Sequence, residues 1–185
     1  IMLGAQSIIN GDNDVVIAGG MESMSNIPHY LEKSRTGLRL GHGQLTDGIL
    51  KDGLWDPYNN YHMGEAGELC SAEYKITRED QDNYAKESYT RTISAYKNGW
   101  FSKELVPVKI EGKTEVLVTE DEEYKKANFD KMPALKPAFR KDGSITAANA
   151  SKINDGAAAV LLVSEKKLKE LNLRPMVRIV SFADA

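Results

Sequence analysis

The sequence contains only one cysteine, Cys70, among its 185 residues. A lone thiol cannot form an internal disulfide or a cysteine metal cluster, so neither can stabilise this chain. Long hydrophobic runs are also missing, since even residues 156–163 fall far short of the roughly 20 residues that span a bilayer. Neither sign of charge dominates, because 24 basic residues oppose 27 acidic ones for a net charge of −3. We therefore expect neither a membrane nor a nucleic acid as partner, and any anionic ligand must be bound by local groups.

Neither end of the sequence resembles a natural terminus. Residues 1–9 carry apolar side chains at helical spacing, and Asn10-Gly11 is typical of a helix end, which predicts a buried helix. The sequence opens inside this helix and shows neither an initiator methionine at the first position nor a basic or apolar leader. Residues 177–182 predict a strand that enters a sheet, and such a strand needs a partner for its backbone groups. We therefore expect the chain to be an internal piece of a longer protein.

Two apolar segments predict the core of an α/β layer. Residues 14–20 form a short apolar run ended by paired glycines, which is typical of a central parallel strand that meets a tight turn. Residues 154–156 predict another turn, and residues 157–163 predict a buried strand after it. Ser164 then predicts the cap of a short helix that ends before Pro175.

The stretch between these segments, from about Ser25 to Arg140, predicts an insertion. It is polar, with long loops and only two short extended runs. Thr77 and Asp80 have the spacing of a capping box and predict the start of a helix, and Gly99 predicts its end. The extended runs flank residues 111–113, which predicts a β-hairpin with a glycine-bearing turn.

Four segments resemble the thiolase family in order and spacing. They are AGGMESMS at residues 18–25, YHMG at residues 61–64, REDQD at residues 78–82 and TAANASKINDGAAA at residues 146–159. Each segment is weak evidence alone, but the resemblance runs over nearly the whole chain, so a chance match of all four is negligible. Among type II thiolases the sequence is most similar to the mitochondrial acetoacetyl-CoA enzymes, through residues 88–91, 120–124 and 147–150.

The resemblance implies a thiolase fold, in which α/β/α layered halves carry an inserted loop domain and which this chain covers only in part. Residues 1–25 would then end the N-terminal half, and residues 26–143 would form the loop domain, with coenzyme A binding and oligomer contacts. Residues 144–174 would supply the last strand and helix of the N-terminal half, and residues 175–185 would begin the C-terminal half. Composition and periodicity alone predict only an α/β domain with a long insertion, an architecture that hosts many unrelated functions.

The same resemblance implies an acetyl-CoA C-acetyltransferase, which reversibly condenses two acetyl-CoA molecules to acetoacetyl-CoA and free coenzyme A. Members of the family use one cysteine as nucleophile, a histidine that activates it and a second cysteine that moves a proton. All of these positions lie outside the chain, so we expect no catalytic residue within it. The resemblance also implies a homotetramer located in mitochondria, with acetyl-CoA and acetoacetyl-CoA as substrates.

Coenzyme A recognition is the role that remains for this chain. The resemblance assigns this role to His62, Met63, Tyr89, Lys126, Ala127, Asn128, Lys131 and Ser151. His62 and Met63 match positions that line the pantetheine channel, and Ser151 matches one that contacts the pantetheine amide. The segment from Lys126 to Lys131 matches the one that surrounds the adenine and the ribose phosphate, where cations favour an anionic nucleotide.

Simpler roles for these residues remain open. His62 can point to solvent from a loop, Ser151 can cap a turn or a helix, and Lys126 can be a solvated lysine. Lys126 also stands where the family has arginine, so it lacks the planar stacking and fork geometry of a guanidinium.

A potassium site is implied by the same resemblance. Tyr89, Ala147, Ala148 and Ala150 match the site of the mitochondrial enzymes, where a tyrosine oxygen and backbone carbonyls bind the ion. The alanines are equally compatible with simple packing, because a loop that brings its backbone close to an ion needs small side chains. We therefore expect potassium as a bound ion and coenzyme A as a substrate.

Cys70 invites an assignment as nucleophile, but its surroundings argue against one. It lies on a predicted helix of the loop domain, with no glycine-rich turn or histidine motif nearby in the sequence. A buried structural thiol is the prediction here.

Two rival functions remain. One is an enzyme of the same fold with other chemistry, such as a ketoacyl synthase, although the runs GGMESMS and HMG favour a thiolase. The other is a non-catalytic module of the thiolase fold that binds coenzyme A or serves as a scaffold.

Overall fold

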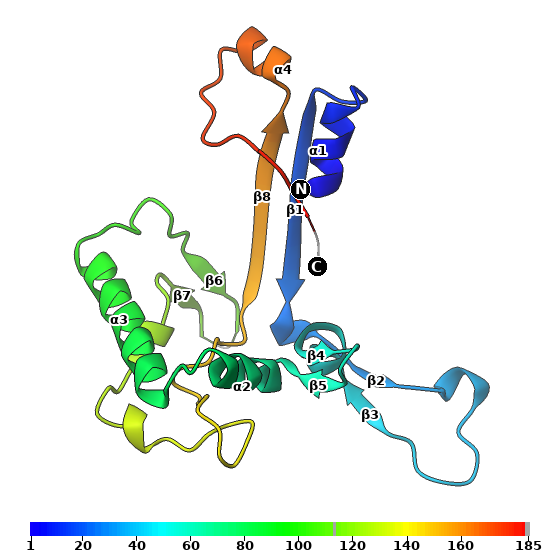
Figure 1. The fold of residues 1–185 in the computed structure, drawn as a ribbon, viewed down its shortest axis with the longest axis vertical. Coiled ribbons are helices and arrows are strands. Elements are labelled where there is room, and N and C mark those ends of the chain that lie inside the picture. The colour runs from blue at the N-terminus through cyan, green and yellow to red at the C-terminus, as the bar shows by residue number, and fades with distance from the viewer. Residues whose placement is uncertain (113, 184–185) are drawn as a thin grey trace. The chain divides into compact units, whose positions relative to one another are not determined.

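The structure is a computed structural model that describes residues 1–112 and 114–183. The chain divides into two compact units, which are drawn in Figure 1. We call Ile1–Pro28 together with Ile153–Ala185 the strand unit, and His29–Lys152 the insert unit. No helix of the described residues is both long enough and apolar enough to cross a membrane.

The strand unit is built around one antiparallel pair of strands. β1 (Val15–Ser23) pairs with β8 (Asp155–Val163) along the full length of both, from Val15 opposite Val163 to Ser23 opposite Asp155. α1 (Met2–Ile9) contacts both strands, and α4 (Glu165–Glu170) follows β8. Both strands carry β-branched side chains, which favour extended backbone.

Both helices of the strand unit end or begin where the sequence predicts. α1 stops at Asn10, and Gly11 follows with a φ of +80°, a left-handed conformation that glycine adopts without strain. The Ser164 hydroxyl accepts the N–H of Lys167 at 3.1 Å and donates to the Asp14 carboxylate at 2.7 Å. The cap therefore stabilises the helix and also ties the end of β8 to the start of β1.

The paired glycines lie inside β1 and not at its end, so the predicted tight turn there is wrong. Gly19 faces Ala159, and a Cβ at Gly19 would lie 2.5 Å from the carbonyl oxygen of Ala158. The glycine is needed because the two backbones approach closely at this point. The partner strand is antiparallel, so the prediction of a parallel strand is also wrong for this pair.

Two further predictions for this unit are wrong. Residues 154–156 do not form a turn, because Asp155 and Gly156 already pair with β1, and the Asp155 carboxylate accepts the Ser25 N–H at 2.9 Å. Residues 177–182 form no strand in the structure as described. A strand forms only where a neighbour exchanges backbone hydrogen bonds with it, and the sequence pattern does not supply that neighbour. The last two residues of the predicted C-terminal segment, 184 and 185, lie outside the described residues.

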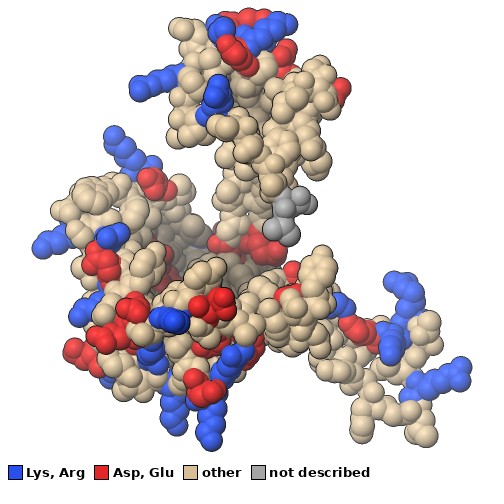
Figure 2. Space-filling model, viewed as in Figure 1, with Lys and Arg blue, Asp and Glu red and all other residues tan. Residues whose placement is uncertain are grey.

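Most apolar side chains of the strand unit are exposed. Among its described residues only Ala5 of α1 is buried, while Leu3 is 81% exposed and Met21 of β1 is 79% exposed. The prediction of a buried helix therefore holds for one residue, because a pair of strands covers only part of the helix surface. Figure 2 shows that charged side chains gather over α4, whereas within β1 and β8 the charged residues are Glu22 and Asp155, both at the same end of the strand pair.

The insert unit contains two helices and three hairpins among its described residues. Its helices are α2 (Met63–Glu73) and α3 (Arg78–Lys97). Its hairpins pair β2 (His29–Leu31) with β3 (Leu45–Asp47), β4 (Trp55–Asp56) with β5 (Tyr61–His62), and β6 (Val108–Ile110) with β7 (Val116–Val118). Short 3-10 turns lie at Ser34–Thr36, Glu123–Lys126 and Met132–Ala134, and a π turn lies at Ile49–Leu54; a further 3-10 turn, Met24–Asn26, follows β1 in the strand unit.

The hairpin of β6 and β7 confirms the predicted hairpin, although its strands are shorter. Lys113, in the predicted turn, lies outside the described residues. The prediction of only two extended runs in this stretch is wrong, because β2 to β5 were missed. Strands of two or three residues carry no readable alternation, so their pairing depends on the rest of the fold.

The start of α3 confirms the predicted capping box. The Thr77 hydroxyl accepts the Asp80 N–H at 3.1 Å, and the Asp80 carboxylate accepts the Thr77 N–H at 3.0 Å. The hydrogen bonds from Thr77 hold the pKa of Asp80 below its usual range. The helix ends at Asn98, and Gly99 follows with a φ of +70°.

A buried carboxylate joins α2 to a distant loop. Glu68 is 5% exposed and accepts the N–H groups of Ser144 and Ile145 at 2.9 and 2.8 Å. Burial raises the pKa of Glu68, but these hydrogen bonds and the charge of Arg140 outweigh it and hold the pKa below its ordinary value. The carboxylate is therefore an anchor for the loop that leads to residues 146–152.

Candidate functional site

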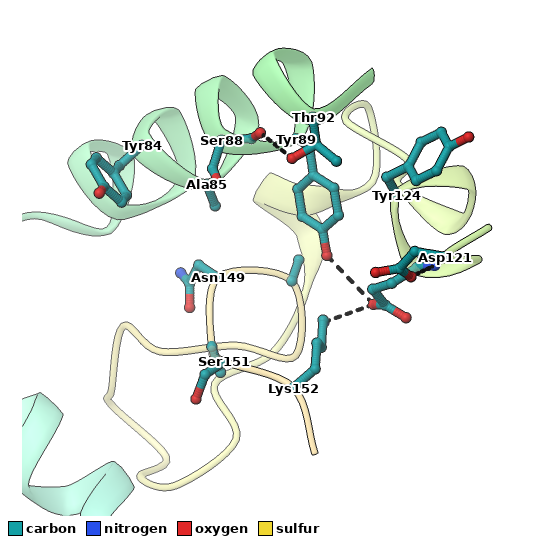
Figure 3. Close-up of a pocket in the computed structure, with 13 residues that line it drawn as sticks. Tyr84, Ala85, Ser88, Tyr89, Thr92, Asp121, Tyr124, Asn149, Ser151 and Lys152 are labelled. Carbon is teal, nitrogen blue, oxygen red and sulfur yellow. Dashed lines mark hydrogen bonds and ion pairs between the residues drawn. The ribbon is translucent and has the colours of Figure 1, made fainter. Parts of the chain in front are cut away.

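A cavity of about 320 Å³ opens beside α3 within the insert unit, as Figure 3 shows. Its walls come from α3, from residues 121–124 and from residues 148–152. Four of the predicted site residues line it: Tyr89, Ala148, Ala150 and Ser151. The structure therefore brings together residues of two segments that lie far apart in the sequence.

The loop at residues 146–150 is closed by its own hydrogen bonds. Thr146 is fully buried, and its carbonyl accepts the Ala150 N–H at 2.9 Å. The Asn149 side chain accepts the Thr146 N–H at 2.7 Å, and the Thr146 hydroxyl accepts the Ala148 N–H at 3.2 Å. This turn presents Ala148 and Ala150 to the cavity, and the N–H groups of Thr146, Ala148 and Ala150 are all paired within it.

A chain of polar contacts holds this loop against α3. The Asn149 amide donates to the Asp82 carboxylate at 2.9 Å, and Asp82 accepts Arg78 Nε at 2.8 Å. The same guanidinium donates to the carbonyls of Met132 at 2.7 Å and Leu135 at 3.2 Å. One arginine therefore links the loop before Ser151 to the segment after Lys131, because a planar guanidinium offers several donors in a fixed geometry.

Glu123 is the charged centre of the cavity wall. Its Oε1 accepts the Tyr89 hydroxyl at 3.5 Å and pairs with Lys152 Nζ at 3.5 Å, and its Oε2 pairs with Lys126 Nζ at 3.3 Å. Figure 3 shows the Tyr89 ring and the Lys152 side chain pointing toward the same carboxylate. Partial burial raises the pKa of Glu123, but the Lys126 hydrogen bond and the charges of both lysines outweigh it and lower the pKa.

Lys152 also reaches the loop that precedes it. Its ammonium donates to the carbonyl oxygen of Ala147, a predicted potassium ligand, although the Ala147 residue itself does not line the cavity. The Lys152 side chain is 31% exposed, so its charge lies at the edge of solvent. A positive charge is thus already bound between the Ala147 carbonyl and Glu123.

His62 and Met63 lie elsewhere, at the start of α2. The Nδ1 atom of His62 accepts the Gly64 N–H at 2.8 Å and caps the helix, so a neutral ring carries its proton on Nε2. The ring stacks on Phe139 with centroids 4.8 Å apart. A Cβ at Gly64 would lie 2.4 Å from the Phe139 ring, which explains the glycine. Neither His62 nor Met63 is among the residues that line the cavity.

The predicted nucleotide segment follows the 3-10 turn Glu123–Lys126. Lys126 is exposed and pairs with Glu122 at 3.8 Å in addition to Glu123. The Asn128 side chain accepts the Lys131 N–H at 3.2 Å, which shapes the turn that follows. Ala127 is half-buried, and Lys131 is exposed. These residues do not line the cavity, but Lys126 is connected to it through Glu123.

Cys70 lies on α2 as predicted, but its side chain is exposed, so the prediction of a buried thiol is wrong. Glu68, two positions earlier, is the buried residue of this helix. Residues two apart on a helix point to different faces, and burial of Glu68 therefore directs Cys70 away from the core.

Sequence reasoning missed three residues of this site. Asn149 and Lys152 lie inside the motif that carried the resemblance, and Glu123 lies in the segment 120–124. These residues contribute to the family resemblance, and none of them was predicted as a site residue. A carboxylate and a lysine near predicted cation ligands are charged groups that could have indicated their role.

The chain is similar in sequence to a family of thiolase domains and to named acetyl-CoA acetyltransferases. Residues 1–166 match the family described as thiolase, N-terminal domain. The chain is 52% identical over 188 residues to the cytosolic acetyl-CoA acetyltransferase of Gibberella zeae, and covers 47% of that protein. It is 50% identical over 188 residues to the mitochondrial acetyl-CoA acetyltransferase of Bos taurus, and covers 44% of it. All of this chain is included in both matches.

A solved structure is similar in fold as well as sequence. The thiolase of Ascaris suum, solved in complex with coenzyme A, superposes on 94% of this chain with a TM-score of 0.81 and 46% identity. The match covers 44% of the Ascaris chain. The present chain thus spans less than half the length of the proteins to which it is similar.

Proposed function

Because this chain belongs to the thiolase family, we propose that it provides the coenzyme A-binding part of an acetyl-CoA C-acetyltransferase, which reversibly condenses two acetyl-CoA molecules to acetoacetyl-CoA and coenzyme A. The observation that carries this proposal is the cavity that combines Tyr89, Ala148, Ala150 and Ser151. The names of the relatives and the coenzyme A of the Ascaris complex support the same ligand. The thiolase match favours this function over that of a ketoacyl synthase.

Two segments would hold opposite ends of coenzyme A. Ser151 is exposed at the cavity, where its hydroxyl can pair with the amide groups of pantetheine. Lys126 and Lys131 are exposed cations that can attract the phosphates of the nucleotide end, with Ala127 and Asn128 between them. Lys126 must leave Glu122 and Glu123 to do so, and such exposed pairs are weak enough to exchange. The Arg78 network connects the two segments.

Coenzyme A binding by the full-length protein tests this proposal. We expect Lys131→Gln and Ser151→Ala each to raise the Kd for coenzyme A by roughly five- to tenfold, the effect of one lost polar or charge-assisted contact. Isothermal titration measures the Kd, and Lys97→Gln on α3 is the control. Unchanged affinity in both variants, or equal loss in the control, would contradict the proposed site.

His62 and Met63 are proposed as walls of the pantetheine channel, and the helix cap separates two roles of His62. His62→Ala removes both the cap and the imidazole, whereas asparagine caps helices well and removes only the imidazole. We expect His62→Asn to keep the helix cap while it loses the stacking on Phe139, and to raise KM for acetoacetyl-CoA more than it lowers kcat, because the lost ligand contact is with the carrier. A normal KM in His62→Asn would limit the residue to capping α2.

A non-catalytic module that binds coenzyme A is the second candidate function. The full-length protein distinguishes the two, since an enzyme cleaves acetoacetyl-CoA in the presence of coenzyme A and a binding module only retains the ligand. We expect cleavage, and we expect Cys70→Ser to leave it unchanged because Cys70 is exposed on α2 and does not line the cavity. A homotetramer in mitochondria completes the proposal, although both cytosolic and mitochondrial relatives are similar to this chain.

Potassium is proposed as an ion bound at Tyr89, Ala147, Ala148 and Ala150. The donor set fits, because a phenol oxygen and backbone carbonyls suit a hard cation, and the ammonium at the Ala147 carbonyl shows that this oxygen accepts a positive charge. When bound, the ion would supply positive charge that orders the loop. The hydrogen bonds within residues 146–150 already hold this loop, so they limit how much of its order depends on the ion.

A further inference from the structure

The ammonium of Lys152 lies between the Ala147 carbonyl, one oxygen of the proposed cation site, and Glu123, which bonds to Tyr89, another member of that site. It donates to the Ala147 carbonyl and pairs with Glu123 at 3.5 Å, and the same carboxylate oxygen accepts the Tyr89 hydroxyl. We propose that Lys152 is a tethered cation that occupies this position, and that potassium competes with it. This inference rests on the proposed potassium site, and it concerns the regulation of that site by the chain itself.

The chemistry of the two cations makes them alternatives. Both are monovalent, and both are satisfied by oxygen acceptors, the ammonium through three N–H donors. Lys152 lies five residues from Ala147, so the tether keeps the ammonium beside the carbonyl at an effective concentration of about millimolar or more. Free potassium must exceed this local competitor before it occupies the position.

The surrounding charge argues against both cations binding together. Glu123 already pairs with Lys126 through its second oxygen. A potassium ion beside Lys152 and Lys126 would place a third positive charge near one carboxylate, and like charges at such distances repel. Displacement of Lys152 relieves this repulsion, and its partly exposed side chain can move into water at little cost.

Competition between Lys152 and potassium can affect Ser151, the proposed coenzyme A contact, because the two residues are adjacent in the backbone. Lys152 follows Ser151 directly, and its ammonium bonds back to Ala147, so the contact closes the loop around residues 147–152. The loop is therefore ordered by a covalently attached cation when potassium is absent. Exchange of Lys152 for potassium frees the lysine while the loop keeps a positive charge.

The experiment compares the full-length protein with Lys152→Met, which keeps the apolar stem and removes the charge. The melting temperature is followed while potassium chloride replaces sodium chloride at constant ionic strength. We expect wild type to be stabilised only at high potassium, and Lys152→Met to melt lower in sodium and to reach half of its potassium-dependent stabilisation at a roughly tenfold lower concentration. Lys103→Met, an exposed lysine away from the cavity lining, should titrate like wild type.

A second pair of variants keeps the inference testable if Lys152→Met folds poorly. Lys152→Gln keeps a polar side chain without charge and should show the same shift, and addition of Tyr89→Phe should abolish its potassium response. Identical potassium titrations of wild type and both Lys152 variants, or no response in any of them, would overturn the inference. Coenzyme A binding measured in the same samples separates this result from a failure of the proposed function, which would appear as absent binding in every salt.

Discussion

The strand unit and the insert unit are stabilised by different kinds of interaction. In the strand unit, β1 and β8 pair along nine residues each, and Ala5 is the one buried apolar residue among those that the structure describes. In the insert unit, polar side chains such as Glu68 and Arg78 bond to backbone groups far away in the sequence. Loops do not form continuous backbone pairing with one another, so specific side chains must bond to their buried N–H and C=O groups.

The difference teaches where each unit is sensitive. A pair of strands held by backbone hydrogen bonds tolerates many different side chains. Substitution is expected to destabilise it mainly where the two backbones approach closely, as at Gly19. A loop anchored by one carboxylate depends on that residue. Native-state hydrogen exchange reports the two units separately, because amides of β1 and β8 belong to one and those of Ser144 and Ile145 to the other.

The largest effect is expected for Glu68→Gln in the insert unit. The variant loses the negative charge of a carboxylate that accepts hydrogen bonds from three donors, the Ser144 N–H, the Ser144 hydroxyl and the Ile145 N–H. We therefore expect a loss of about 3 kcal/mol in the free energy of local opening. Exchange at Ser144 and Ile145 measures it, with Glu73→Gln at the exposed end of α2 as control. Equal acceleration in β1 and β8 would show that the two units unfold as one.

The next effect is expected for Gly19→Ala in the strand unit. The added Cβ meets the backbone of Ala158 and Ala159 at 2.5 and 3.1 Å, and we expect a loss of about 2 kcal/mol in the stability of the β1–β8 pair. Gly20→Ala is the matched control, because nothing lies within 4 Å of its Cβ position. Similar losses in both variants would mean that strand entropy and not close approach explains the glycines.

A smaller effect is expected for Arg78→Lys. Lysine can keep the charge near Asp82 but cannot reach Met132 and Leu135 with the same planar fork, so we expect a loss of about 1–2 kcal/mol. Urea unfolding measures the loss, and Arg91→Lys, an exposed pair with Glu87, should change little. Equal urea midpoints of unfolding for Arg78→Lys and Arg91→Lys would show that the Arg78 hydrogen bonds do not stabilise the insert unit.

The dependence of stability on acid pH should also distinguish the insert unit from the strand unit, because Glu68 belongs to the insert unit. Since the pKa of Glu68 is lower in the folded state than its ordinary 4.5, its contribution is present above that value and is lost as the pH falls below it through the folded pKa. We expect protection of Ser144 and Ile145 to fall with acid in wild type, and to be flatter in Glu68→Gln. An unchanged acid dependence in the variant would assign the effect to other carboxylates.

The smallest effect is expected for Cys70→Ser. The thiol is exposed on α2, so we expect a change within about 0.5 kcal/mol in the free energy of unfolding. Thermal unfolding of the reduced protein checks this value. A loss of several kcal/mol would restore the prediction of a buried structural thiol.

Local signals explain what could be predicted from the sequence. The capping box of Thr77 and Asp80, the cap at Ser164 and the stop at Gly11 depend on residues within four positions of each other. Their hydrogen bonds form whatever surrounds them, so their positions in the structure confirm the predictions. The motifs likewise identified the thiolase family, because a family resemblance depends on residue types in order.

Distant contacts explain what could not be predicted. The antiparallel direction of β1 and β8, the exposure of Cys70 and the burial of Glu68 each depend on a segment that lies far away in the chain. The predicted coenzyme A and potassium residues stay predictions, although the cavity brings four of them together.

By itself, the sequence determined the helix caps, the β6–β7 hairpin and the family of this protein, because each is encoded by neighbouring residues or by their order. Only the tertiary structure decided which strand pairs with β1, which carboxylate is buried and which cation reaches the Ala147 carbonyl. These outcomes require backbone and charged groups from distant segments to satisfy one another. Such partners are not contained in any local pattern of the sequence.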